Sequence, residues 1–178
     1  MKHALALGCV AALISVAACN RGGGEEAPPP GNQEEAARNV AAGEATAAEI
    51  AAVMHARHEH YEEMGKAMKG ITTELKGRSP SVDTIRRHAA LIAGYGPELL
   101  TWFPEGSGPE SGRDTRAKAE IWSDPETFHR RGLAFREESA RFNQIAQRGD
   151  AEAIREALPS LGDTCKNCHD RFRAPEDD

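Results

Sequence analysis

The sequence feature that most restricts the possible fold is the pentapeptide Cys165-Lys166-Asn167-Cys168-His169. C-x-x-C-H is the attachment signature of a c-type haem, in which two thiols form thioethers and the histidine ligates the iron. Positions i, i+3 and i+4 lie on one face of a helix, so Cys165, Cys168 and His169 converge on one side. The motif therefore predicts a helix that holds a covalent haem, which the rest of the fold must enclose.

The cysteine pair has two other interpretations. A redox disulfide between Cys165 and Cys168 normally opens a helix after a strand, and no strand-like run precedes Cys165. A zinc site needs four ligands, usually from a second Cys or His pair, and the other two cysteines lie within residues 1–19. A mixed metal site that includes His58 and His60 has no recognisable spacing. Haem attachment is the favoured interpretation.

The N-terminal residues have the pattern of an export signal. Lys2 precedes an apolar run over residues 4–18, which has the length of a signal peptide and is short for a membrane-spanning helix. The sequence V-A-A-C at 16–19 resembles a bacterial lipobox. We expect residues 1–18 to be a lipoprotein signal peptide and Cys19 to be lipidated, which places the protein in the bacterial periplasm on a membrane anchor. An ordinary signal peptide would leave Cys19 as a free thiol.

Composition divides the remaining chain into a tether and one domain. Residues 19–45 contain G-G-G and P-P-P runs among scattered polar residues, a composition that cannot form a core. Residues 46–178 have the length of a single domain. The chain has 28 acidic and 22 basic residues, a formal net charge of −6, which makes nucleic acid an unsuitable partner.

Apolar residues spaced three and four apart recur along four stretches of the domain, which is typical of amphipathic helices in a bundle. The predicted inward positions are Ile50, Met54, Arg57, Tyr61, Met64 or Gly65, Met68, Ile71 and Leu75 in the first stretch, Ile85, Ala89, Ile92 and Leu99 in the second, Phe128, Gly132, Phe135, Ser139, Phe142 and Ala146 in the third, and Ile154, Leu158, Leu161, Cys165, Cys168 and Phe172 in the fourth. The pattern predicts an all-α, antiparallel four-helix bundle with the covalently bound haem in its core.

Capping and breaking residues predict where these helices begin and end. The first helix is expected over 46–75, and Ser-Pro at 79–80 begins the second. Asp-Pro at 124–125 begins the third helix. The loop over 104–122 is long enough to be functional or to cover a site. Pro159 is expected to kink or interrupt the fourth helix.

The chain resembles the class II c-type cytochromes, and it is most similar to cytochrome c′, which is a known four-helix bundle. The haem motif continues as C-K-N-C-H-D-R-F-R over 165–173, and E-I-W-S-D at 120–124 resembles the segment that leads into the family's third helix. Arg57, Tyr61 and Gly65 follow the spacing of the family's first helix. The resemblance covers essentially the whole predicted bundle.

The resemblance implies one covalent haem c and a set of residues around it. Cys165 and Cys168 would be the thioether residues, His169 the proximal iron ligand, Arg173 a basic residue near the proximal face, Arg57 the partner of a propionate, and Tyr61 the bulky distal residue. Gly65 would leave room for the macrocycle. Three of these assignments have alternatives. Arg57 could extend from the edge of the helix face to solvent, Arg173 could simply complement a helix C-terminus, and Gly65 could be a glycine that the helix merely tolerates.

The function depends on the side of the iron opposite His169. A strong second ligand gives a low-spin electron carrier, and Met64 is the residue that could supply it. Tyr61 at the distal position instead favours a high-spin, five-coordinate iron that transfers single electrons and binds the diatomic gases NO and CO. Ligation by a Tyr61 tyrosinate is a further alternative. We expect no enzymatic activity, because only His58 or His60 could serve as a distal acid or base.

The resemblance also implies partners. A redox partner protein is expected, because an electron carrier must exchange electrons with another centre. The family is typically a homodimer, formed through its first two helices, so the same helices are the expected interface here.

Overall fold

The computed structural model describes residues 45–175, and the predictions on the signal peptide, on Cys19 and on most of the tether lie outside these residues. The described chain is built from helices and has no strand, only an isolated antiparallel bridge between Ala117 and Arg173. Over the same residues, no helix combines the length and apolar character needed to cross a membrane.

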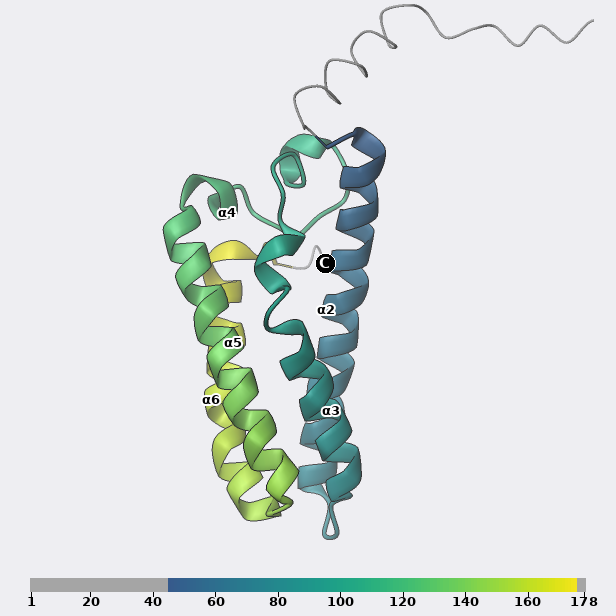
Figure 1. The fold of residues 1–178 in the computed structure, drawn as a ribbon, viewed down its shortest axis with the longest axis vertical. Coiled ribbons are helices and arrows are strands. Elements are labelled where there is room, and N and C mark those ends of the chain that lie inside the picture. The colour runs from purple at the N-terminus through teal and green to yellow at the C-terminus, as the bar shows by residue number, and fades with distance from the viewer. Residues whose placement is uncertain (1–44, 176–178) are drawn as a thin grey trace, which may run out of the picture.

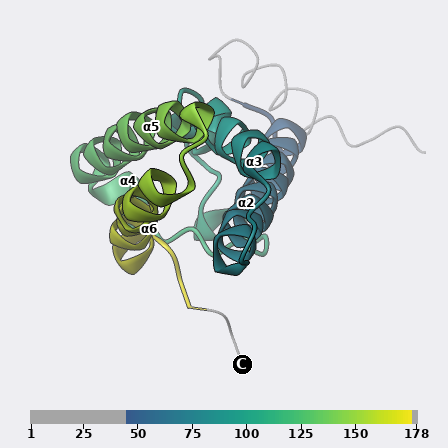
Figure 2. The ribbon, with the colours of Figure 1, turned by 90° about the horizontal axis from the view of Figure 1, so that it is seen from below.

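Four helices form the body of the molecule: α2 (Ala47–Lys76), α3 (Val82–Tyr95), α5 (Pro125–Arg148) and α6 (Ala151–Phe172). They alternate in direction, and the neighbours in space are α2 with α3, α3 with α5, and α5 with α6 (Figures 1 and 2). The predicted all-α, antiparallel four-helix bundle is confirmed.

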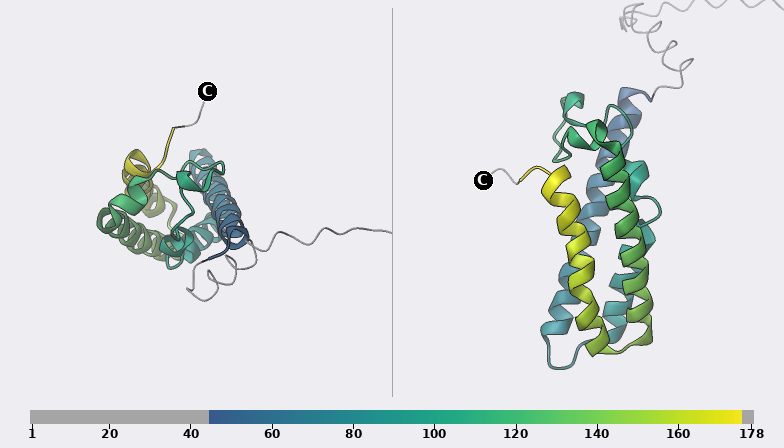
Figure 3. Two further views of the ribbon diagram at one scale, coloured as in Figure 1. Left: turned by 90° about the horizontal axis from the view of Figure 1, so that it is seen from above. Right: turned by 90° about the vertical axis from the view of Figure 1, so that its left-hand side faces the viewer.

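The connection from α3 to α5 crosses one end of the bundle, as the side view shows (Figure 3). It contains two short 3₁₀ helices, η1 (Leu99–Trp102) and η2 (Pro109–Ser111), and one helical turn, α4 (Glu120–Ser123). The loop predicted over 104–122 is therefore partly helical. Leu99, which was expected on the second helix, lies in η1 and is buried.

The helix ends follow from local capping. Thr46 and Glu49 form a reciprocal capping box at the start of α2. Asp124 accepts a hydrogen bond from the Thr127 backbone N–H, and Pro125 occupies the first turn of α5, as predicted. Asp150 caps α6 by accepting bonds from two backbone N–H groups.

Two predicted helix features are wrong. The second helix begins two residues later than expected, because Ser81, not Ser79, accepts the capping bond from Thr84, and Pro80 lies before the helix. The fourth helix is not interrupted at Pro159, since α6 is continuous across it. Pro159 is exposed, so the hydrogen bond that proline removes falls on the solvent side of the helix, where water can replace it.

The predicted inward stripes match the buried residues closely. All six predicted positions of α5 are buried. On α2, Met64 and not Gly65 takes the inward position, and Ala67 is buried where Met68 was expected. The main core cluster consists of Met64, Ala67, Ile71, Leu75, Ile85, Ala89, Ile92, Leu99, Trp102, Phe135, Phe142, Ala146, Ile154, Ala157 and Leu161. A second cluster consists of Ile121, Phe128 and Phe172, and the partly buried Leu100 and Phe103 pack against both clusters.

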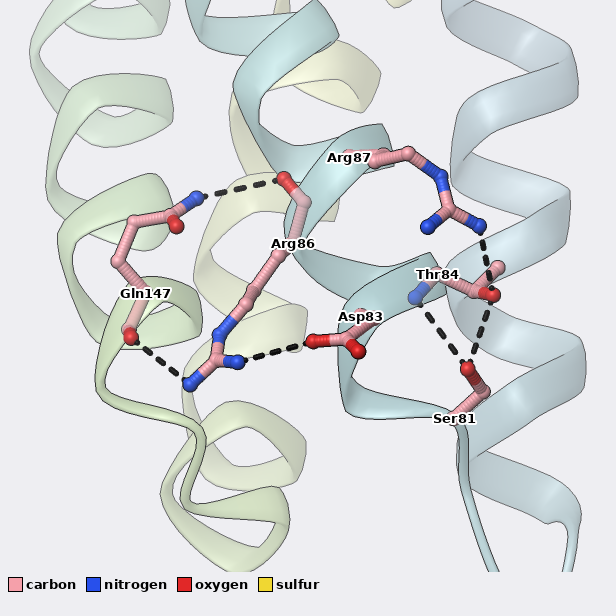
Figure 4. A network of polar contacts seen from close by, with 6 residues as sticks. All are labelled: Ser81, Asp83, Thr84, Arg86, Arg87 and Gln147. Carbon is pink, nitrogen blue, oxygen red and sulfur yellow. Dashed lines mark hydrogen bonds and ion pairs between the residues drawn. The ribbon is translucent and has the colours of Figure 1, made fainter.

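A polar network joins α3 to the end of α5 (Figure 4). Arg86 donates to Asp83 on its own helix at 3.0 Å and to the backbone carbonyl of Gln147 at 3.1 Å. The Gln147 side chain returns a bond to the carbonyl of Arg86 at 3.3 Å. This reciprocal pair fixes the packing of two helices that are distant in sequence.

Gly149 ends α5 in the left-handed region, with a φ of 83°. A Cβ atom there would lie 2.6 Å from Arg86 Nη2, so Gly149→Ala both strains the backbone and disturbs the polar network. We expect a loss of about 2 kcal/mol in the free energy of unfolding, measured by urea denaturation followed by circular dichroism.

Gly112 provides the matched control for this substitution. It has a φ of 66° but no atom within 4 Å of its Cβ position. Gly112→Ala should therefore lower the free energy of unfolding only through backbone strain, by about 1 kcal/mol. Equal losses at the two positions would contradict a role for the network at Gly149.

Candidate haem site

The three residues of the haem motif lie together near the C-terminal end of α6. Cys165 packs against the main core cluster and Cys168 against the second cluster, and both side chains are partly buried. Burial raises the pKa of Cys165, and burial together with Cys165 raises the pKa of Cys168 to about 11. Both thiols are therefore protonated at neutral pH and lie within an apolar environment.

Tyr61 of α2 faces His169 of α6. The centroids of the two rings are 6.4 Å apart, with an angle of 65° between their planes. The two helices are not a closely packed pair along their backbones, so the contact between them here is made by the side chains. Tyr61 also contacts Trp102 and Phe103 edge-on, with centroid distances of 5.6 and 6.4 Å.

Both facing rings are uncharged at neutral pH. Burial is the main cause that raises the pKa of Tyr61, and the nearby Cys168 adds to it. Burial also lowers the pKa of His169, assisted by the positive charges of Arg173 and Arg116. A neutral imidazole has a nitrogen lone pair free to bind a metal.

The donor set fits a c-type haem. Two thiols and one neutral imidazole lie on one helix face, and aromatic side chains from α2 and η1 lie opposite. The zinc alternative lacks a ligand set, since no group of three or more His, Cys, Asp or Glu side chains within 45–175 gathers to hold a metal. His58 is exposed, and His60 packs between the rings of Tyr95 and Trp102.

Arg57 is buried, with 5% of its surface exposed, and its bonds lead to the α3–α5 connection. Its two terminal nitrogens donate to the carbonyl of Trp102, to the hydroxyl and carbonyl of Ser107, and to the Thr115 hydroxyl. It therefore does not extend to solvent. Its pairing with a haem propionate stays a prediction.

The remaining predicted residues differ in their placement. Gly65 is exposed, with open space at its Cβ position. Arg173 follows α6 and is exposed, yet it lies close enough to Tyr61 and His169 to affect both electrostatically. Met64 is 7% exposed within the main core cluster, whereas Tyr61 makes the ring contact with His169.

Sequence reasoning missed Phe103 and Arg116. Phe103 contacts Tyr61 in the site. Arg116 is brought near His169 because residues 116–118 pair with the chain that follows α6, where Arg116 Nε donates to the carbonyl of Ala174 at 3.0 Å. Neither residue lies on a helix with a periodic pattern, so the only sequence signal was that Arg116 lies in the predicted loop over 104–122 and Phe103 directly precedes it.

Comparisons with known proteins agree with this geometry. The profile of the family described as Cytochrome C' matches residues 52–173. A cytochrome c' of Rhodospirillum rubrum is 34% identical over 73% of this chain and 87% of its own length. One from Pararhodospirillum photometricum is also 34% identical, over 61% of this chain and 86% of its own.

A solved structure supports the same assignment. A cytochrome c' described as having ligand-controlled dimer dissociation superposes with a TM-score of 0.64 at 25% identity, covering 69% of this chain and 95% of that chain. Sequence profile, relatives and fold therefore coincide over the helical bundle. The chain belongs to the cytochrome c′ family and is a c-type cytochrome with a covalent haem c.

Proposed function

We propose that this protein is a high-spin, five-coordinate cytochrome c′ that transfers single electrons and binds NO and CO. Cys165 and Cys168 would hold the haem through thioethers, and His169 would ligate its iron. The bound haem supplies a one-electron redox change and one open coordination position. The surrounding side chains would limit which molecules reach the iron.

The observation that carries this proposal is the Tyr61 ring opposite His169, at a centroid distance of 6.4 Å. Tyr61 is bulky, and its ring would restrict the access of water and larger molecules to the iron. Trp102 and Phe103 extend the same aromatic wall.

An absorption spectrum of the reduced full-length holoprotein tests the proposal. We expect a broad high-spin spectrum that changes on addition of CO. In Tyr61→Ala, the CO association rate should rise about 100-fold, because a bulky ring no longer opposes the incoming ligand; this is equivalent to about 2.7 kcal/mol of barrier. A sharp low-spin spectrum that CO leaves unchanged would contradict an open position.

The alternative function is a low-spin electron carrier with Met64 as the second axial ligand. Its support is that Met64 is a buried thioether three residues from Tyr61. Our proposal expects Met64→Ala to keep the high-spin spectrum. Conversion from low spin to high spin in this variant would establish the alternative.

Peroxidase-like chemistry has little support from the site. Such chemistry needs an acid or base near the distal face. His58 is exposed and His60 is enclosed by Tyr95 and Trp102. We therefore propose a carrier and gas-binding protein, not an enzyme.

The cellular setting is proposed from the sequence. We place the protein in the bacterial periplasm, anchored through lipidated Cys19, with a redox partner protein. A homodimer through α2 and α3 is consistent with the cytochrome c' whose dimer dissociation is described as ligand-controlled.

A further inference from the structure

The Arg57 side chain of α2 donates four hydrogen bonds to the α3–α5 connection. Its Nη1 donates to the carbonyl of Trp102 at 3.2 Å and to Ser107 Oγ at 3.1 Å. Its Nη2 donates to the carbonyl of Ser107 at 2.9 Å and to Thr115 Oγ1 at 3.2 Å. These bonds use every N–H group of the two terminal nitrogens. The acceptor residues follow Arg57 by 45 to 58 positions in the sequence.

Three of these bonds are buried and the bond to Thr115 is partly buried, and all four acceptors are uncharged. Arg57 is 5% exposed and Ser107 is fully buried. Removing a guanidinium from water is costly unless its donors are satisfied. If Arg57 moved, the Ser107 and Trp102 acceptors would lose their partner inside the protein. The arrangement therefore holds the connection firmly against α2.

The same guanidinium fixes the ring of Phe103. Arg57 Cζ lies 4.6 Å from the centroid of that ring, within the range of a cation–π contact. The Phe103 ring also lies edge-on to Tyr61 at 6.4 Å and to Phe128 at 4.9 Å. Arg57 thus links the held connection to the residue that faces His169.

We propose that Arg57 is a positioning residue for gas binding, which acts by fixing Phe103 as the second ring of the distal wall beside Tyr61. The inference rests on the proposed open coordination position. When the rings of Tyr61 and Phe103 are both held in place, they move little as a ligand approaches the iron. The association rate of a bulky ligand is then reduced more than that of a small one. Phe103 is then a residue that determines ligand size.

Rates of CO and n-butyl isocyanide binding to the reduced full-length holoprotein test this inference. Phe103→Ala removes the ring, Arg57→Gln removes the charge and most donors, and Thr115→Val removes one acceptor while leaving Arg57 in place. We expect CO association to rise about 10-fold in the first two variants and about 3-fold in the third. The isocyanide rates should rise more than the CO rates in all three.

Thr101→Val is the matched control. Thr101 is exposed in the same connection, and its hydroxyl donates to the carbonyl of Glu98. This variant should keep both rates. Melting temperatures measured in parallel report any general loss of stability. The ratio of the isocyanide rate to the CO rate reports the distal wall, because a purely structural role would not change that ratio.

The outcomes distinguish the inference from the proposed function. Faster binding in Arg57→Gln alone, with Thr115→Val and Phe103→Ala unchanged, would overturn it and favour a direct Arg57–propionate contact. Unchanged rates in all three variants, in a wild-type protein that binds CO, would overturn the inference and leave the proposed function standing. A wild-type protein that does not bind CO would overturn both.

Discussion

Replacing both Cys165 and Cys168 by Ala should abolish covalent haem attachment. The thioethers require both thiols, which lie side by side on the inner face of α6. The intact mass of the purified, denatured protein should lack the mass of one haem, and a denaturing gel should show no haem staining. Each single variant should retain at most one thioether and release part of its haem under the same conditions.

Cys19→Ser is the matched control, because it removes a cysteine outside the bundle. It should keep the covalent haem and lose the lipid, so that the protein moves from the membrane fraction to the soluble periplasmic fraction. Covalent haem in the Cys165 and Cys168 double variant would contradict the assignment. If Cys19→Ser changed the mass only by the difference between sulfur and oxygen and left the fractionation unchanged, the lipid anchor alone would be contradicted.

Phe142→Ala should cause a large loss of stability. Phe142 is fully buried in α5 and has the largest volume among the fully buried side chains of the described residues. Truncating a buried Phe to Ala removes apolar contacts and leaves a cavity, which costs about 3–5 kcal/mol. That is a large part of the stability of an ordinary domain, about 5–15 kcal/mol. Urea denaturation of the holoprotein, followed by circular dichroism, measures the loss.

Leu91→Ala provides the comparison for Phe142. Leu91 is 36% exposed, and its truncation should change stability by less than about 1 kcal/mol. The absorption spectrum of both variants should match the wild type, since neither residue lies in the haem site. A loss below about 1 kcal/mol for Phe142→Ala would show that this layer of the core is not tightly packed.

The helical periodicity was sufficient to predict most of the fold. Every third or fourth residue of α5, from Phe128 to Ala146, is buried as predicted. Asp124 begins the helix that it was expected to cap. The errors at Ser79 and Pro159 are local. Both Ser79 and Ser81 are suitable N-cap residues, and Ser81 takes that position. At Pro159, the solvent side of α6 tolerates a missing backbone hydrogen bond.

Some residues of the candidate site could be predicted from the sequence, and others could not. The spacing of Cys165, Cys168 and His169 on one helix, and of Arg57 and Tyr61 on another, was sufficient to place them on inward faces. The partners of Arg57 could not be predicted, because they lie in the α3–α5 connection and have no periodic pattern. The same holds for Phe103 and Arg116.

The sequence by itself determined the helices, their inward faces and the haem attachment motif, because these depend on spacing within a few turns of one helix. Only the tertiary structure decided that Tyr61 and His169 face each other at 6.4 Å. It also decided that Arg57 holds the α3–α5 connection and that Phe103 lies beside Tyr61. These contacts join segments far apart in the chain, so they depend on how the packed helices place an irregular loop.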